Sequence, residues 1–143
     1  MKRVIYARRG GLDAIEIIEE DNPIPAAGQV RIEVHRAGIN FADLMMRQGL
    51  YGGAPDFPFT PGYEVSGIVR EQGHGVDHVA VGDRVVALTG FGGYAEQVTV
   101  DSDRVWPLPE QVSFDAAAAM PVTYLTAHHM LVHLGNFKPG DTI

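Results

Sequence analysis

Cysteine is absent from the 143 residues of this sequence. Disulfide bonds, thiol catalysis and zinc-thiolate sites are therefore excluded. Long apolar runs are also missing, and none approaches the roughly 20 residues that span a bilayer. The start of the chain carries basic residues but no apolar stretch typical of a signal peptide. We therefore expect a cytoplasmic protein without a membrane span.

Positive charge is scarce, with 11 Lys and Arg residues against 18 Asp and Glu residues and a formal net charge of −7. Binding to nucleic acid requires a basic face, so we predict no nucleic-acid partner. The hydrophobic fraction of 45% is typical of a globular domain that buries a core. The 17 glycines and 9 prolines indicate a fold with many turns.

Short strands dominate the first three quarters of the chain. In residues 29–35, Val30, Ile32 and Val34 alternate with polar residues, which predicts a half-buried strand. Pro23 and Pro25 interrupt pairing before it, because proline has no amide hydrogen to donate. Further strands are predicted at residues 4–7, 15–17, 65–71, 95–100 and 104–108, and residues 79–88 predict a Gly82-Asp83 turn that feeds a fully buried strand. This spacing predicts a closed or nearly closed barrel.

A helix is predicted at residues 40–48. Asn40 suits its N-cap, Asp43 suits the capping-box position, and Gly49 suits its end. Asp43 and Arg47 are four residues apart, so we expect them to pair on the helix surface.

The alternating pattern changes near the C-terminus. Ser113 is placed to cap a helix over residues 116–119, and a second helix is predicted from Pro121 to a stop at Gly135. Residues 138–143 predict a turn that enters a strand. An unpaired strand start suggests a truncated chain.

Polar and aromatic side chains gather in residues 38–64, between glycines and prolines. Such groups on turns of a rigid scaffold indicate a functional site. The candidates are Asn40, Asp43, Tyr51, Tyr63 and Glu64.

A set of motifs in fixed order gives this pattern a family context. The motifs are Asn40-x-x-Asp43, Gly49-x-Tyr51, Pro61-Gly62-x-Glu64, Val81-Gly82-Asp83-Arg84-Val85 and Lys138-Pro139-Gly140-Asp141. The chain resembles the N-terminal GroES-like catalytic domain of medium-chain dehydrogenases/reductases, most closely the zinc-independent quinone oxidoreductases and the vesicle amine transport protein-like branch.

The resemblance implies a mainly β fold with a few helices (α+β), a GroES-like partly open β-barrel. It implies a substrate-binding domain at residues 1–120, then a linking helix and the start of a nucleotide-binding domain at residues 121–143. The glycine fingerprint of that second domain does not occur in the sequence. By the same resemblance, the parent protein is a homodimer that uses NADPH to reduce a quinone or an activated alkene.

The resemblance also excludes zinc. The positions that match the Cys, His and Cys ligands of zinc-dependent alcohol dehydrogenases are Asn40, Tyr63 and Val122. An amide, a neutral phenol and an alkyl group do not form a tetrahedral zinc site. We therefore predict no metal.

The site roles follow from the matched positions. Asn40, Tyr51 and Tyr63 are predicted to bind substrate, and Asn40, Asp43 and Thr126 to bind the cofactor. Tyr51 is the predicted proton donor, since a tyrosine is normally protonated at neutral pH.

Each assignment has a purely structural alternative: Asn40 and Asp43 as helix caps only, Tyr51 as a surface aromatic, Tyr63 as filler of the space left by the metal, and Thr126 as a packing residue. Glu64 is expected to pair with a buried base or a backbone amide. His128, His129 and His133 are expected to be solvated.

Three functions remain open from the sequence. The first is the substrate-binding half of an NADPH-dependent quinone or enone reductase, inactive alone because catalysis needs cofactor and substrate held together. The second is a non-enzymatic binding module of the vesicle-protein type. The third is a co-chaperonin, which a heptameric mass in solution would support.

Overall fold

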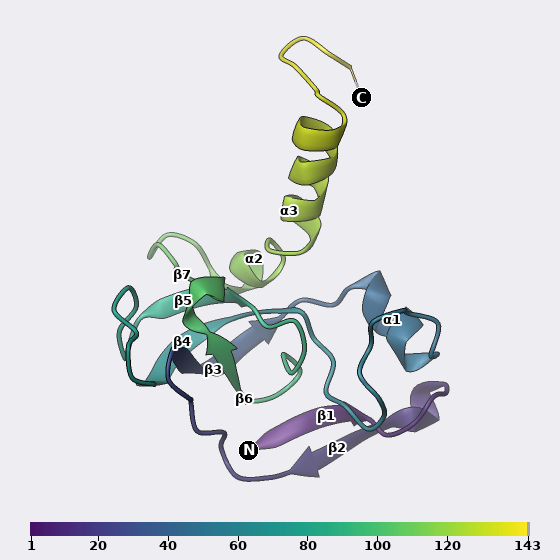
Figure 1. The fold of residues 1–143 in the computed structure, drawn as a ribbon, viewed down its shortest axis with the longest axis vertical. Helices are drawn as coiled ribbons and strands as arrows, with labels where there is room; N and C mark the ends of the chain where they lie inside the picture. The colour runs from purple at the N-terminus through teal and green to yellow at the C-terminus, as the bar shows by residue number, and fades with distance from the viewer. Residues whose placement is uncertain (143) are drawn as a thin grey trace.

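A computed structural model describes residues 1–142 of the chain (Figure 1). A two-stranded hairpin, β1 (Lys2–Tyr6) with β2 (Ile15–Glu19), lies beside a five-stranded sheet in the order β6-β3-β4-β5-β7. Its strands are β3 (Gln29–Ala37), β4 (Glu64–Gln72), β5 (Arg84–Leu88), β6 (Gln97–Asp101) and β7 (Val105–Pro107). All neighbouring strands are antiparallel.

The sheet is open, so the expected closure into a barrel is wrong, while the mainly β fold class with a few helices is confirmed. The hairpin meets the rest of the domain through two isolated bridges, between Arg3 and Ala95 and between Tyr6 and Phe59. The chain after β2 passes through Pro23 and Pro25, which have no amide hydrogen to extend a ladder toward β3.

The predicted Gly82-Asp83 turn is confirmed, and it feeds the strand β5, whose residues alternate between half-buried and buried. The Ala80 N–H donates to the Asp83 carboxylate at 2.8 Å, and Gly82 has a φ of +97°. A positive φ is readily adopted by glycine and breaks the strand geometry. The pairing with β4 therefore begins at Arg84.

Residues 1–142 include three α-helices outside the two sheets. α1 (Phe41–Arg47) and α2 (Phe114–Ala118) are short, and α3 (Thr123–His128) continues as the π-helix η3 (His129–Leu134). Two 3₁₀ turns, η1 (Leu12–Ala14) and η2 (Ser102–Arg104), connect strands. Figure 1 shows α3 and η3 as a rod that projects away from the sheet.

The predicted C-terminal helices are confirmed. Ser113 Oγ accepts a hydrogen bond from the Ala116 N–H at 3.1 Å and so caps α2, and the rod ends at Gly135. The strand expected to begin at Ile143 lies outside the described residues. Within residues 1–142, no helix is long and apolar enough to cross a bilayer.

The main core lies on one face of the sheet, and the predicted alternation of β3 is confirmed. Val30 and Ile32 are fully buried against β4, β5 and β6, in a cluster that includes Val65, Val69, Val85 and Val98.

Truncating Ile32 to alanine should strongly destabilise the domain. Its side chain is 0% exposed in a central strand, so Ile32→Ala leaves a cavity and costs about 2–5 kcal/mol of unfolding free energy. Ile17→Ala is the matched control, because Ile17 is 70% exposed in the hairpin and should change stability by less than about 0.5 kcal/mol. Urea denaturation followed by circular dichroism measures both, and equal effects would contradict the assigned core.

Candidate functional site

The first turn of α1 places Asn40 and Asp43 as the sequence predicted. Asn40 is the N-cap, with extended backbone angles, and forms a capping box with Asp43. The Asp43 carboxylate accepts a hydrogen bond from the Asn40 N–H at 2.8 Å. Gly49 follows the helix with a φ of +66°, which explains the stop there.

The predicted surface pair between Asp43 and Arg47 is wrong. Both residues are buried, and Asp43 is only 2% exposed. The capping box turns the Asp43 carboxylate back toward Asn40, where the Tyr94 hydroxyl also donates to it at 2.7 Å. The second carboxylate oxygen, Oδ1, is buried without a hydrogen-bond partner among the described residues.

Glu64 lies directly behind Asn40 and is 1% exposed. Its Oε1 accepts from Asn40 Nδ2 at 2.9 Å, and its Oε2 accepts from the backbone N–H of Val122 at 2.7 Å. The expected pairing of Glu64 with a backbone amide is therefore confirmed. One buried carboxylate thus contacts two of the three positions that match metal ligands in the zinc-dependent enzymes.

Tyr63, the residue before Glu64, points toward α1. Its hydroxyl donates to Met46 Sδ at 3.7 Å, and its ring packs on Phe91 at 5.5 Å between centroids. Burial raises the pKa of Tyr63 to about 12, and the neighbouring Tyr51 phenol adds to the shift. Tyr51 itself is 42% exposed. The two phenols are therefore neighbours, with Tyr63 inside and Tyr51 at the solvent edge.

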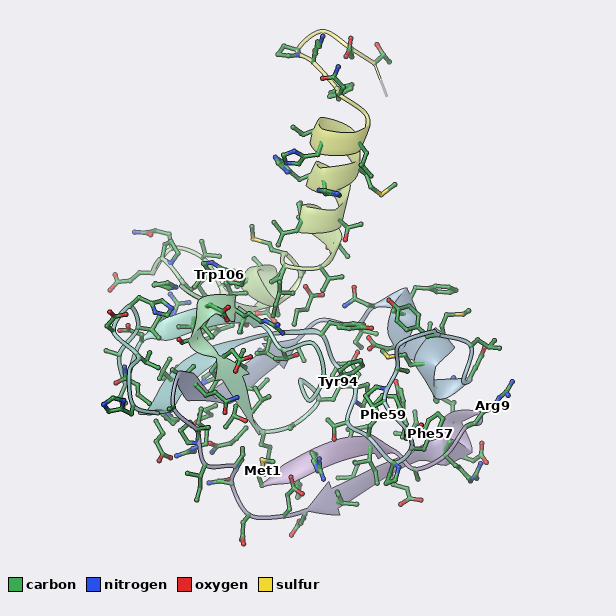
Figure 2. The ribbon with its side chains drawn as sticks, in the orientation of Figure 1. Met1, Arg9, Phe57, Phe59, Tyr94 and Trp106 are labelled. Atoms are coloured by element: carbon green, nitrogen blue, oxygen red, sulfur yellow. The ribbon has the colours of Figure 1, made fainter. Side chains whose placement is uncertain are left out.

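The surface formed by α1, Tyr51 and Tyr63 is one wall of the candidate site, and an aromatic cluster packs against it. The Phe59 ring lies 5.6 Å from Tyr6, 5.4 Å from Phe57 and 6.0 Å from Phe91, measured between ring centroids. Figure 2 shows Phe57 and Phe59 between α1 and the hairpin. These contacts rigidify the loop of residues 49–62, which carries Tyr51.

One buried tyrosine, Tyr6, and two half-buried ones, Tyr63 and Tyr94, predict a loss of stability at high pH. Burial raises the pKa of Tyr6, Tyr63 and Tyr94 above 10.0, and the Asp43 carboxylate adds to each shift. Below pH 10 both folded and unfolded chains hold these protons, so the stability is full. Above pH 10 the unfolded chain loses its protons first, and stability falls as the pH rises toward about 12.

Urea midpoints between pH 8 and 12 should therefore decrease steadily above pH 10. Tyr63→Phe removes one of the three groups and should make the decrease shallower. A constant midpoint up to pH 11 would contradict the burial of these phenols.

Thr126 lies one turn beyond Val122 on α3, where its N–H donates to the Val122 carbonyl at 3.0 Å. Its side chain is exposed. His128, His129 and His133 are also exposed, as expected, and the His133 ring centroid lies 5.5 Å from that of His128 and 5.4 Å from that of His129. No group of three His, Asp or Glu residues in the described part of the chain is arranged to hold a metal. The absence of zinc remains a prediction.

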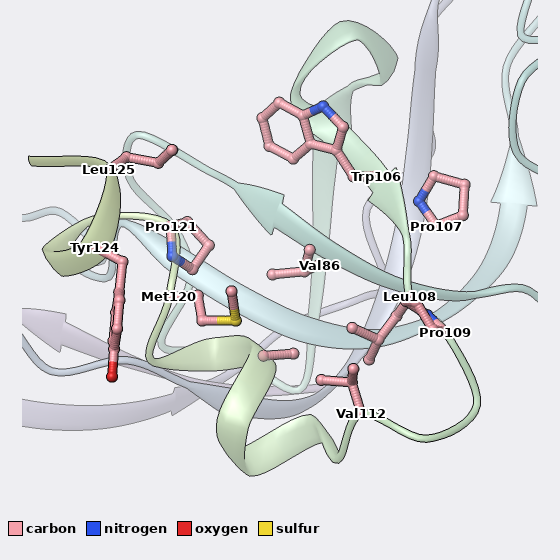
Figure 3. A pocket seen from close by; sticks show the side chains of 11 residues that line it. Val86, Trp106, Pro107, Leu108, Pro109, Val112, Met120, Pro121, Tyr124 and Leu125 are labelled. Atoms are coloured by element: carbon pink, nitrogen blue, oxygen red, sulfur yellow. The ribbon is translucent and has the colours of Figure 1, made fainter. Parts of the chain in front are cut away.

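An apolar groove was not predicted from the sequence. It has a volume of about 590 Å³ and lies between β7, α2 and the start of α3 (Figure 3). Its lining comprises Val86, Trp106, Pro107, Leu108, Pro109, Val112, Ala117, Met120, Pro121, Tyr124 and Leu125. None of the predicted site residues lines it. The apolar run at residues 105–109 is the sequence feature that points to this groove, but only the fold brings the run next to α3.

Comparison with known proteins places these features in a family. Residues 26–110 match the model of the alcohol dehydrogenase GroES-like domain. The chain is 47% identical over 128 residues to quinone oxidoreductase-like protein 2 of Bos taurus, a match that covers 89% of this chain and 37% of that protein. The chain therefore spans about a third of the length of this curated relative.

Two solved structures have the same fold. The human synaptic vesicle membrane protein VAT-1 homolog-like protein superposes with a TM-score of 0.93 at 37% identity, over 98% of this chain and 46% of that one. Escherichia coli quinone oxidoreductase, solved in complex with NADPH, superposes with a TM-score of 0.87 at 34% identity, over 92% of this chain and 40% of that one. The chain belongs to the alcohol dehydrogenase GroES-like domain family, among the quinone oxidoreductase and VAT-1-like members of the medium-chain dehydrogenases/reductases.

Proposed function

We propose that this chain is the substrate-binding half of an NADPH-dependent, zinc-independent quinone or enone reductase. The observation that carries the proposal is the grouping of Asn40, Tyr51 and Tyr63 around α1, on a wall supported by Glu64 and the aromatic cluster. The similarity to a quinone oxidoreductase solved with NADPH supports the choice of cofactor.

The two phenols have different roles in this proposal. Tyr51, at the solvent edge, donates its proton to the reduced substrate and regains one from water. Tyr63 keeps its own proton, because burial raises its pKa to about 12, and its ring forms the inner part of the site beside Tyr51. NADPH, when bound, supplies the hydride that completes the two-electron reduction.

The polar groups beside this wall fit the amide of a nicotinamide ring. Asn40 uses one amide hydrogen on Glu64 and keeps a second, while the exposed Thr126 side chain forms no hydrogen bond within residues 1–142. We propose that both contact the cofactor. Asp43 is buried behind Asn40, so we propose that it acts by holding Asn40 in place.

The proposal divides the longer protein at about residue 120. Residues 1–120 form the substrate-binding domain, and the projecting rod of α3 and η3 leads into the nucleotide-binding domain (Figure 1). We call this longer protein, in which both domains are joined, the whole protein.

NADPH binding by the whole protein tests the proposal. Titration followed by nicotinamide fluorescence should give a dissociation constant between about 1 μM and 1 mM, the range of typical Michaelis constants.

No measurable NADPH binding would favour a second candidate, a non-enzymatic binding module. The apolar groove beside Trp106 supports that candidate, because grooves of this size and character accept apolar ligands (Figure 3). The similarity to the VAT-1 homolog-like protein also supports it.

A further inference from the structure

The buried carboxylate of Glu64 links segments that are far apart in the sequence. Asn40 precedes it by 24 residues and Val122 follows it by 58. Both partners are uncharged donors, and each occupies one carboxylate oxygen. A buried charge is costly unless its hydrogen bonds are satisfied, so this arrangement is held in one geometry.

The backbone of Gly38 packs directly against the Glu64 carboxylate. A Cβ on Gly38 would overlap the Glu64 carboxylate and would lie 2.6 Å from the Ala118 carbonyl oxygen. The Gly38 N–H also donates to the Glu64 carbonyl at 3.1 Å. Residue 38 is therefore glycine because the chain before α1 passes directly against this side chain.

The start of α3 depends on the same carboxylate. Thr123 Oγ1 bonds only to Ala119, within the connection between α2 and α3. In the described part of the chain, Glu64 makes the one side-chain hydrogen bond between the start of α3 and the sheet. Thr126 is one helical turn further on, so its position follows that of Val122.

We propose that Glu64 is a positioning residue: its carboxylate fixes the start of α3 relative to Asn40, so that Asn40 and Thr126 reach one bound cofactor together. The statement about the cofactor rests on the proposed function, whereas the tether itself does not. Glu64 does not contact the reacting atoms and acts through Asn40 and Val122.

Glu64→Gln tests the tether with almost no change in shape. Both partners of Glu64 are donors, but a glutamine offers one acceptor oxygen and one NH₂ group, so one donor must face another. Hydrogen exchange of the Val122 backbone amide and the Asn40 side-chain amide, measured by NMR on this chain, should become at least about tenfold faster at one of the two positions. Unchanged exchange at both amides would overturn the tether.

A charge swap provides the rescue. In the double variant Asn40→Asp with Glu64→Gln, the introduced glutamine donates its amide hydrogen to the introduced aspartate, while its oxygen accepts from Val122. Slow exchange at Val122 should return if the bonds of this side chain hold the segments together. If Glu64→Gln fails to fold, Val122→Pro removes the Val122 donor, at a helix start where proline is tolerated and where φ is −83°. The readout is then the Thr126 amide, which bonds to the Val122 carbonyl: faster exchange supports the tether and unchanged exchange overturns it.

Kinetics of the whole protein test whether this position matters for the reaction. Glu64→Gln should lower kcat for quinone reduction by about 10²-fold, because small displacements of reacting groups have effects of that size. The KM for quinone should change little and the variant should remain folded at the assay temperature, which separates positioning from a general loss of structure. Glu71→Gln is the control: it removes the same charge from β4 outside the site and should leave kcat unchanged.

The outcomes separate the two proposals. Faster exchange with an unchanged kcat would overturn the positioning role while leaving the reductase assignment intact. A wild-type whole protein without quinone reduction would overturn the proposed function, and the exchange data would then decide the tether alone.

Discussion

Tyr51→Phe in the whole protein is expected to lower kcat for enone or quinone reduction by about 10²–10⁴-fold. The substitution removes only the hydroxyl, and a positioned proton donor contributes an acceleration of that size. Because Tyr51 is 42% exposed, the folded structure should not depend on this hydroxyl. Stopped-flow measurement of NADPH oxidation, with binding measured separately, isolates the effect on the chemical step.

Tyr124→Phe is the matched control, because Tyr124 is also an exposed tyrosine but lies on α3 and lines the apolar groove, which contains none of the predicted site residues. It should retain full turnover. Wild-type turnover in Tyr51→Phe would leave Tyr51 as part of the scaffold and would remove the proton donor from the proposed mechanism.

Asp43→Ala is expected to destabilise the domain by about 2–4 kcal/mol. The substitution leaves the Asn40 N–H without its buried acceptor, and an unsatisfied buried donor costs about 1–3 kcal/mol. The Tyr94 hydroxyl also loses its shorter hydrogen bond and keeps only the Gly38 carbonyl, at 3.2 Å. The capping box of α1 is lost at the same time. A loss of this size is a large share of the stability of a domain, and urea denaturation at pH 7 measures it.

Asp56→Ala is the control for Asp43→Ala. Asp56 is exposed in the loop between α1 and β4, and its removal should change stability by less than about 0.5 kcal/mol. A similarly small effect at Asp43 would contradict its role in holding α1 and Tyr94.

Features set by local chemistry were predictable from the sequence. The ends of α1 follow from Asn40 and Gly49, and the cap of α2 follows from Ser113, because capping depends on residues within one turn. The alternation in β3 identified its buried face, because successive side chains of a strand point to opposite faces of the sheet. The family resemblance then placed Asn40, Tyr51 and Tyr63 in one region, and the structure groups them around α1.

Features set by contacts over long sequence distances were not predictable. The burial of Asp43 depends on Tyr94, which is 51 residues away, so the helix pattern alone suggested a surface pair with Arg47. The open sheet depends on how the hairpin meets β6, which strand spacing does not report. The groove beside Trp106 requires β7 and α3 to be adjacent, and only the fold shows this.

The most direct test of the central claim measures NADPH oxidation with a quinone by two proteins side by side: this 143-residue chain and the whole protein. The account predicts turnover by the whole protein and none by the chain alone, because the substrate wall and the nucleotide site belong to different domains. Turnover by the chain alone at a rate similar to that of the whole protein would contradict the account, as would the absence of turnover in both.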